Sequence, residues 1–481
     1  MTKKENEHKK KIASIDQGID KLEKIERKLT ETENKMGVLP VNELIWKMSV
    51  PAMLSMLINA LYNIVSSIFV SHLDTTGKPL AAVTLAFPIQ FLIIAVAVGT
   101  GVGINSLIAR RLGAKRYKEA NSAANHGFII ALISWIFFAA FGIFFADDFI
   151  RLYTSDPYIQ ENATIYLSTV TTLSVFMFIT ITAEKTLQAT GNMLFPMIFN
   201  IAGAVINVIL DPILIFGLLG APKMGVPGAA VGAVIAQFCA MSIALFMLFK
   251  YDHHVKISYK GFRLSLKTIK DIYSVGLPTI IMMSIGSVMI TFLNGILIKF
   301  SETAVAVLGA YFRLNTFLFM PVFGLNQGIL PIIGYNFGAG NKGRLLKAYK
   351  SGLMIALIVM ALGTLLFWVI TEQFLLMFNA DAEMMEIGIP ALRTISLCFV
   401  FAAFSIITTG MFQALGHGFL SMMVALLRQL ILIVPLSYVL SHMFGLNATW
   451  FSFPVAELLS NVLVVIFLRY IYKKEIKPLG N

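Results

Sequence analysis

A carboxylate and an amide stand one helical turn apart in a stretch that is otherwise apolar enough to lie in lipid. Asp211 is followed by Pro212, and Asn207 precedes it by four positions. Residues at i and i+4 share one face of a helix, so both side chains can contact one ligand. Ionised groups inside a membrane are costly and mark ion or proton pathways. We interpret the pair as a cation or proton site; the alternative is that Asp211 caps a helix segment that restarts at Pro212.

A second acid, Glu184, precedes the turn at Gly191 and should lie nearer one membrane surface than Asp211. At the helical rise the two carboxylates differ in depth by roughly 20 Å, so they do not share one proton. We predict that Glu184 is a relay or a ligand contact, with Gln188 one turn later. Lys185 points about 100° away around the helix, which leaves an interfacial structural role for Glu184 equally open.

Charged residues also occur inside apolar segments of the second half of the chain. Arg428 and Glu457 have similar expected depths, and we predict that they form a structural ion pair. Arg313 lies deeper than a residue that extends its charge to the membrane surface needs to be. We therefore retain Arg313 as a weak candidate for lining a cavity.

Composition identifies the chain as an integral membrane protein. Of its 481 residues, 57% are hydrophobic and 13% are charged, whereas about 25% are charged in a typical soluble domain. The long apolar runs lack period-two alternation, which predicts membrane-spanning helices rather than a barrel. The net charge of +12 collects in alternate loops, which indicates membrane topology and not nucleic-acid binding.

Sequence signatures of enzymes are missing. The chain contains no GxSxG, HExxH or phosphate-binding GxxxxGK[ST] motif. The two cysteines, Cys239 and Cys398, lie inside apolar runs without metal-ligand spacing. We therefore expect no enzymatic activity, no metal site and no cofactor beyond a coupling ion.

Hydropathy predicts twelve transmembrane helices. Their ranges are 44–71, 80–109, 121–146, 160–188, 194–219, 227–249, 269–299, 304–334, 346–371, 385–414, 418–443 and 447–471. Lysine and arginine collect in alternate breaks, such as Arg110 to Lys118, and the opposite breaks are more acidic. By the positive-inside rule, both termini are cytosolic in a multi-pass protein of the cell membrane.

The chain repeats itself at a shift of 225 positions. Leu187-Gln188-Ala189-Thr190-Gly191 recurs as Phe412-Gln413-Ala414-Leu415-Gly416, and Leu112-Gly113-Ala114 recurs as Phe337-Gly338-Ala339. Each repeat holds six spans, so the two copies enter the membrane in the same orientation as parallel repeats. We predict a charged N-terminal extension at 1–40, a six-helix lobe at 41–250, a linker at 251–268 and a second lobe with a short tail at 269–481. Neither Asp211 nor Glu184 is duplicated by the repeat.

Several motifs together resemble the multidrug and toxic-compound extrusion (MATE) transporters, particularly their DinF-like prokaryotic branch. The motifs are Leu61-Tyr62-Asn63-Ile64-Val65, Ala86-Phe87-Pro88, Leu112-Gly113-Ala114, Gln188-Ala189-Thr190-Gly191, Leu210 to Gly217 and Gly225 to Ala230. The resemblance implies a V-shaped pair of six-helix lobes that exports organic, often cationic, compounds in exchange for inward proton or sodium flow. The partners it implies are small organic cations and membrane lipid, without nucleic acid, and we expect a monomer.

The resemblance also implies a cation site in the first lobe. In that branch, an acid on the first helix joins an Asn and an Asp on the fifth and a Thr on the sixth. Asn207 and Asp211 match, but Ser66 stands where an Asp is common and Ala233 where the Thr is found. Because a hard metal cation needs several oxygen ligands, we expect proton rather than sodium coupling.

Two further expectations complete the prediction. Asn63, from the first motif, is a weaker candidate for the substrate cavity. The alternative function is a flippase for lipid-linked sugars of the same superfamily, in which Arg313 and Arg428 would supply cationic groups.

Overall fold

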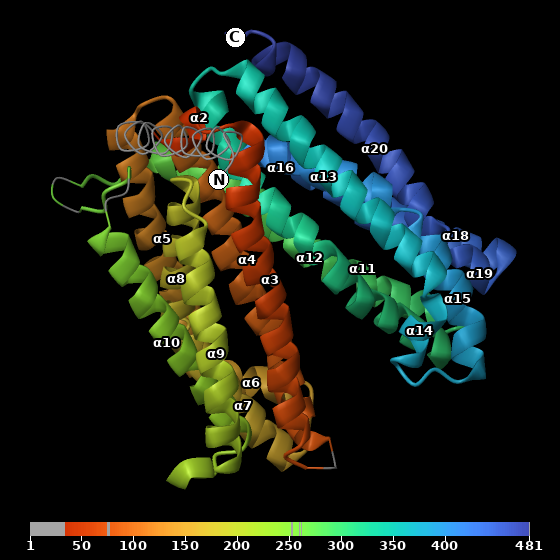
Figure 1. The fold of residues 1–481 in the computed structure, drawn as a ribbon. Helices are drawn as coiled ribbons and strands as arrows, with labels where there is room; N and C mark the ends of the chain where they lie inside the picture. The colour runs from red at the N-terminus through yellow and green to blue at the C-terminus, as the bar shows by residue number, and fades with distance from the viewer. Residues whose placement is uncertain (1–33, 75–76, 252–253, 259, 261, 481) are drawn as a thin grey trace, which may run out of the picture.

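The chain folds into two bundles of helices that meet at one end and diverge toward the other, as Figure 1 shows. The computed structural model describes residues 34–74, 77–251, 254–258, 260 and 262–480. Within these ranges every regular element is a helix. We call the end where the bundles meet the closed end and the opposite one the open end.

The first lobe begins with α2, a short helix at the closed end. Its elements, in chain order, are α2 (Lys35–Val38), α3 (Val41–Ser71), α4 (Lys78–Gly113), α5 (Tyr117–Phe144), α6 (Ala146–Arg151), α7 (Pro157–Thr172), α8 (Val175–Ala189), α9 (Leu194–Phe216), η1 (Leu218–Gly220) and α10 (Val226–Lys250).

The second lobe follows the connection between Lys250 and Leu266. Its elements are α11 (Leu266–Leu297), α12 (Glu302–Gly338), α13 (Lys342–Val369), α14 (Thr371–Leu376), α15 (Ala382–Ser396), α16 (Phe399–Leu415), α17 (Gly418–Leu426), η2 (Leu427–Ile433), α18 (Val434–Phe444), α19 (Leu446–Thr449), α20 (Ser452–Ile471) and η3 (Tyr472–Ile476).

The helices have the length and composition of membrane spans. Among the described residues, ten helices are long and apolar enough to cross a bilayer, and two bent pairs raise the number to twelve if each counts as one span. This confirms the prediction of an all-helical membrane protein with twelve spans. The predicted ranges agree with the observed helices to within several residues.

The two bent pairs are breaks that the sequence analysis did not predict. α7 and α8 meet at 43°, and α15 and α16 meet at 45°. Prolines do not occupy either break. Instead, the hydroxyl of Ser174 donates to the carbonyl of Thr171 at 2.7 Å, and that of Ser396 donates to Arg393 at 2.8 Å. Serine hydroxyls that bond to carbonyls of the preceding turn compete with the backbone ladder and accompany bends in helices.

The closed end shows the two-fold character of the repeat in its atomic contacts. A Cβ atom on Gly113 would lie 1.8 Å from the carbonyl oxygen of Tyr335, and one on Gly338 would lie 2.0 Å from that of Arg110. Both pairs are related by the 225-residue shift. α4 and α12 therefore cross backbone to backbone at two equivalent glycines, which permit a closer approach than any side chain would allow.

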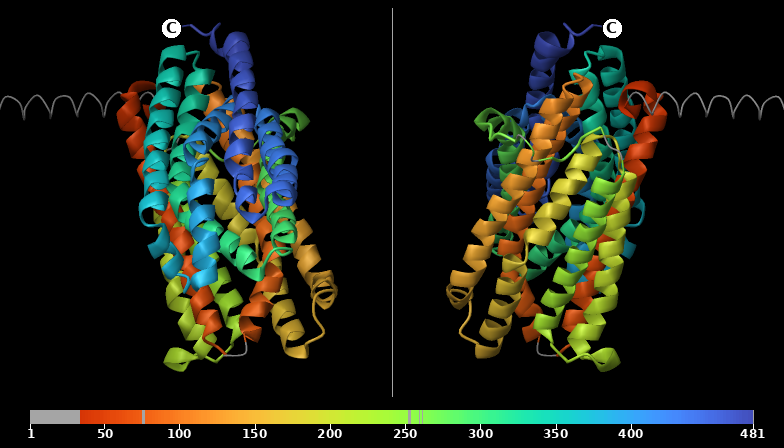
Figure 2. Two further views of the ribbon diagram at one scale, coloured as in Figure 1. Left: turned by 90° about the vertical axis from the view of Figure 1, so that its right-hand side faces the viewer. Right: turned by 90° about the vertical axis from the view of Figure 1, so that its left-hand side faces the viewer.

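α2 joins both lobes at this end. The side chain of Asn34 donates to the carbonyl of Thr190 in the first lobe at 3.1 Å. From the second lobe, Arg344 donates to the carbonyls of Met36 at 3.0 Å and Leu39 at 2.6 Å. Figure 2 shows α2 and the C-terminal helix near the same end of the molecule. Residues 34–39, which we had assigned to the charged extension, are thus packed into the fold; the rest of the extension lies outside the described residues.

Candidate functional site

Asp211 lies on α9, and its side chain is fully buried within the first lobe. Asn207, also buried, donates from its amide to the carboxyl Oδ1 at 3.2 Å. The predicted pairing of these two residues along one helix face is therefore present. α9 continues through Pro212 to Phe216 without a break, so Asp211 does not stand at the start of a helix. Helix capping does not explain its position.

Two neighbouring helices complete the surroundings of the Asp211 carboxyl group. Ser66 of α3 interacts with it from one side. Gly232 of α10 leaves room for the carboxyl group, because a Cβ atom at this position would lie 2.9 Å from Oδ1. Oδ2 has no hydrogen-bond partner among the described residues. Ala233 is the neighbour of this glycine, so α10 adds no side-chain oxygen at either position.

This arrangement favours binding of a proton or a small cation. A buried charged oxygen without a partner is unfavourable by several kcal/mol in order of magnitude. A proton on the carboxyl group would remove that charge, and a bound cation would compensate it. The single carboxylate with one amide and one hydroxyl offers few ligands for a metal cation. Among the described residues, the structure holds no cluster of three or more His, Cys, Asp or Glu side chains that could bind a metal ion.

A second polar cluster surrounds Glu184 on α8, on the side of the first lobe that faces the second lobe. Lys185 forms an ion pair with it, with 2.9 Å between Nζ and Oε1. Gln188 donates to the same oxygen at 2.8 Å. The helical spacing predicts that Lys185 points away from Glu184, but its long side chain curls back to the carboxylate. The helical angle fixes the Cβ direction alone, and four further torsions of a lysine decide where the ammonium lies.

Three further helices contribute to this cluster. Asn200 of α9 donates to Oε2 of Glu184 and to the hydroxyl of Ser55 on α3, both at 3.0 Å. Gln327 of α12 accepts from Lys185 at 2.9 Å, so the cluster bridges the two lobes. Asn200 and Asp211 are eleven residues apart on α9, which is about 16 Å along a helix. The two acids therefore belong to separate sites, as the spacing predicted.

The remaining predicted residues are dispersed. Arg428 of η2 pairs with the buried Glu457 of α20, with Nη1 at 3.1 Å and 3.3 Å from the two carboxylate oxygens. This confirms the predicted ion pair. Arg313 is exposed on α12 and does not contact either polar cluster. The side chain of Asn63 lies outside the described part of the chain.

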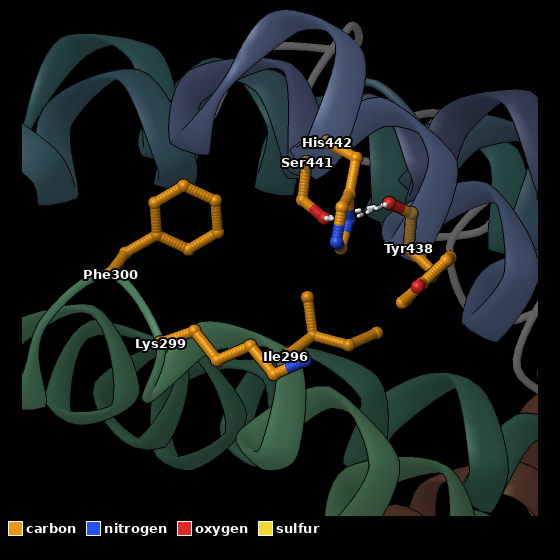
Figure 3. Close-up of a pocket in the computed structure, with 6 residues that line it drawn as sticks. All are labelled: Ile296, Lys299, Phe300, Tyr438, Ser441 and His442. Carbon is orange, nitrogen blue, oxygen red and sulfur yellow. Dashed lines mark hydrogen bonds between the residues drawn. The ribbon is translucent and has the colours of Figure 1, made fainter.

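A pocket at the end of the second lobe is too small for an organic substrate. Figure 3 shows Ile296, Lys299 and Phe300 facing Tyr438, Ser441 and His442 of α18. Its volume is about 110 Å³, whereas ligand pockets typically span about 300–1,000 Å³. None of the predicted site residues lines it. The two polar clusters, and not this pocket, form the candidate site.

Four residues of the clusters were absent from the sequence prediction: Ser55, Asn200, Gly232 and Gln327. The sequence pattern indicated one of them. Asn200 precedes Asn207 by seven positions and Asp211 by eleven, the spacing of a single helix face. No sequence pattern indicated Gln327, because only the approach of α12 to α8 brings it to Lys185.

The fold and these clusters define a membrane transporter built from two lobes around buried polar sites. The chain belongs to the MatE family, since the model of that family matches residues 51–213 and 278–439. These two matched segments lie in the two lobes.

Curated relatives and solved structures agree with this assignment. The chain is similar to the multidrug export protein MepA of Staphylococcus aureus strain MSSA476, with 26% identity over 433 residues that cover 89% of this chain and 94% of the relative. It is also similar to MepA of Staphylococcus haemolyticus, with 26% identity over 85% of this chain and 89% of that protein.

Among solved structures, one described as the outward-facing conformation of a multidrug resistance MATE family transporter has a TM-score of 0.86 and 27% identity, covering 92% of this chain and 98% of that chain. A MOP superfamily transporter from Pyrococcus furiosus has a TM-score of 0.85 and 27% identity, over 93% and 98% of the two chains. The predicted family is therefore confirmed.

Proposed function

We propose that this protein exports small organic compounds, often cations, from the cell, and that an inward flow of protons through Asp211 drives the export. The observation that carries the coupling role is the buried Asp211 carboxyl group, one of whose oxygens has no partner among the described residues. Multidrug export is the activity named for the relatives in two Staphylococcus species. The charge pattern supports a cytosolic closed end, with both termini on that side.

Protonation of Asp211 would couple to drug binding through packing. Loss of the charge lowers the cost of burying the carboxyl group, and this changes how α3, α9 and α10 can pack around it. A ligand or proton shifts a conformational equilibrium only by its different affinity for the two states. We propose that the protonated form favours a different packing of these helices, and hence a different affinity for the exported compound.

Proton coupling is the simpler reading of the ligand set. Oxygen ligands at Asp211 come from one carboxylate, Asn207 and Ser66, and Gly232 and Ala233 supply no side-chain oxygen. Reconstituted protein should export a cationic dye under a pH gradient. Dye transport at the same rate under a sodium gradient, with equal pH on both sides, would contradict proton coupling.

The flippase alternative gains no support from the described residues. Arg428 is already neutralised by Glu457, and Arg313 is isolated from both polar clusters. A monomer that binds membrane lipid and small organic cations remains our expectation.

The deciding experiment for the coupling site is the Asp211→Asn substitution, which retains the shape and removes the titratable group. We expect normal expression and thermal stability, with dye export reduced to the background of cells that lack the protein. Asp148→Asn, at an exposed position, makes the same chemical change and should export normally. Export at the normal rate by Asp211→Asn would mean that another group carries the coupling.

A further inference from the structure

We propose that Lys185 is a built-in competitor for the carboxylate of Glu184, which it withholds from a cationic substrate while the lobes are closed at this end. This inference rests on the proposed export function. It adds a residue that determines whether the site prefers cationic substrates or substrates without net charge. It also makes the release of a cation depend on the arrangement of the lobes, because a contact between the lobes holds Lys185 in place.

The Lys185 ammonium is held on every side. An ammonium has three N–H donors, and Nζ of Lys185 lies 2.9 Å from Glu184 Oε1, 3.1 Å from Gln188 Oε1 and 2.9 Å from Gln327 Oε1. The whole residue is 3% exposed. A lysine in this setting is a fixed cation and not a side chain that reaches for solvent.

The fold provides space for the lysine stem. A Cβ atom on Gly101 of α4 would lie 2.6 Å from Cγ of Lys185. Any residue larger than glycine at this position would push the stem away from its present path. α4 and α8 thus form a slot that directs the ammonium to Glu184.

The pair leaves little charge for a substrate to recognise. Glu184 also accepts hydrogen bonds from Gln188 and Asn200, so its oxygens are occupied. An organic cation that is to use this carboxylate must displace the ammonium. Until then the local net charge is near zero, and the attraction that a cation gains there does not offset the cost of removing that cation from water.

The contact with Gln327 makes this competition depend on the arrangement of the lobes. Gln327 belongs to α12 of the second lobe, whereas Glu184, Lys185 and Gln188 belong to α8 of the first. Separation of the lobes at the closed end removes one of the three acceptors of Lys185. The ammonium then holds Glu184 less firmly, and a cation competes more successfully. Closure restores the third bond and expels the cation.

The test compares two matched dyes, a cationic rhodamine methyl ester and its zwitterionic free acid, on purified and reconstituted protein. Lys185→Gln should bind the ester more tightly by on the order of tenfold, within the usual range of coupling between two ligands, and should export it with a lower KM and a lower kcat. Binding of the free acid should stay unchanged. Lys185→Arg retains the charge and should preserve the wild-type preference.

Two further variants keep the test decisive if Lys185→Gln folds poorly. Gly101→Ala displaces the lysine stem without changing any charge and should also favour the ester. Glu184→Gln leaves the lysine without its carboxylate and should weaken binding of the ester more than that of the free acid.

The outcomes separate this inference from the proposed function. Unchanged dye preference in Lys185→Gln and Gly101→Ala, or an equal change for both dyes, would overturn the competitor role. Failure of the wild-type protein to move any organic dye under a pH gradient would instead contradict the export function.

Discussion

At the scale of single residues, Gly232 is the neighbour of Asp211 that leaves room for its carboxyl group. A Cβ atom there would lie 2.9 Å from the Asp211 carboxyl group. We expect Gly232→Ala to displace that group, lower the free energy of unfolding by about 1–3 kcal/mol as overpacking does, and slow proton-driven dye export. Transport assays in proteoliposomes and thermal unfolding measure the two effects. Gly295→Ala on α11, where nothing lies within 4 Å, is the matched control.

The same scale shows where sequence reasoning about the site ends. The pair Asn207 and Asp211 was predictable because both residues lie on one helix, where spacing fixes the relative position. Ser66 was assigned to this site by resemblance, and the structure places it at the carboxyl group. Lys185 and Gln327 could not be paired from the sequence, since their contact depends on side-chain torsions and on how two distant helices approach.

At the scale of elements, the crossing of α4 and α12 controls how closely the lobes meet. Gly113→Ala or Gly338→Ala would place a Cβ atom 1.8 Å or 2.0 Å from a backbone oxygen of the opposite helix. A backbone atom does not rotate away, so the helices must separate. Spin labels at the exposed positions Lys118 and Lys350 should report a longer distance in either variant by pulsed electron resonance. Gly343→Ala, whose nearest contact is at 3.8 Å, should leave the distance unchanged.

The elements also show which part of the fold was predictable. Twelve spans followed from apolar runs, because the length of a helix across a bilayer is fixed by its thickness. The breaks before Val175 and Phe399 were not predicted. They lie where Ser174 and Ser396 bond to nearby backbone carbonyls, and serine in an apolar run carries no signal that distinguishes a break from a continuous helix.

At the scale of the whole molecule, both lobes contribute to a shared hydrophobic core at the closed end. Among the described residues, the largest hydrophobic cluster includes Leu44 and Ile108 from the first lobe and Leu325 and Ile329 from the second. α2 and Arg344 add hydrogen bonds across the same junction. Export by alternation between the two sides of the membrane requires this junction to open while the other end closes.

A reversible cross-link across the closed end tests that requirement. The backbone nitrogens of Ala114 and Ala339 lie 3.1 Å and 3.0 Å from the Cβ positions that Gly338 and Gly113 lack, and both alanines are exposed. Cysteines at these two positions, joined by a short bifunctional methanethiosulfonate reagent, should abolish proton-driven dye export, and a reducing agent should restore it. Either single cysteine variant treated in the same way should keep its activity. Export at the normal rate with the cross-link in place would show that the lobes need not part at this end, and would thereby contradict the alternation on which the roles of both Asp211 and Lys185 depend.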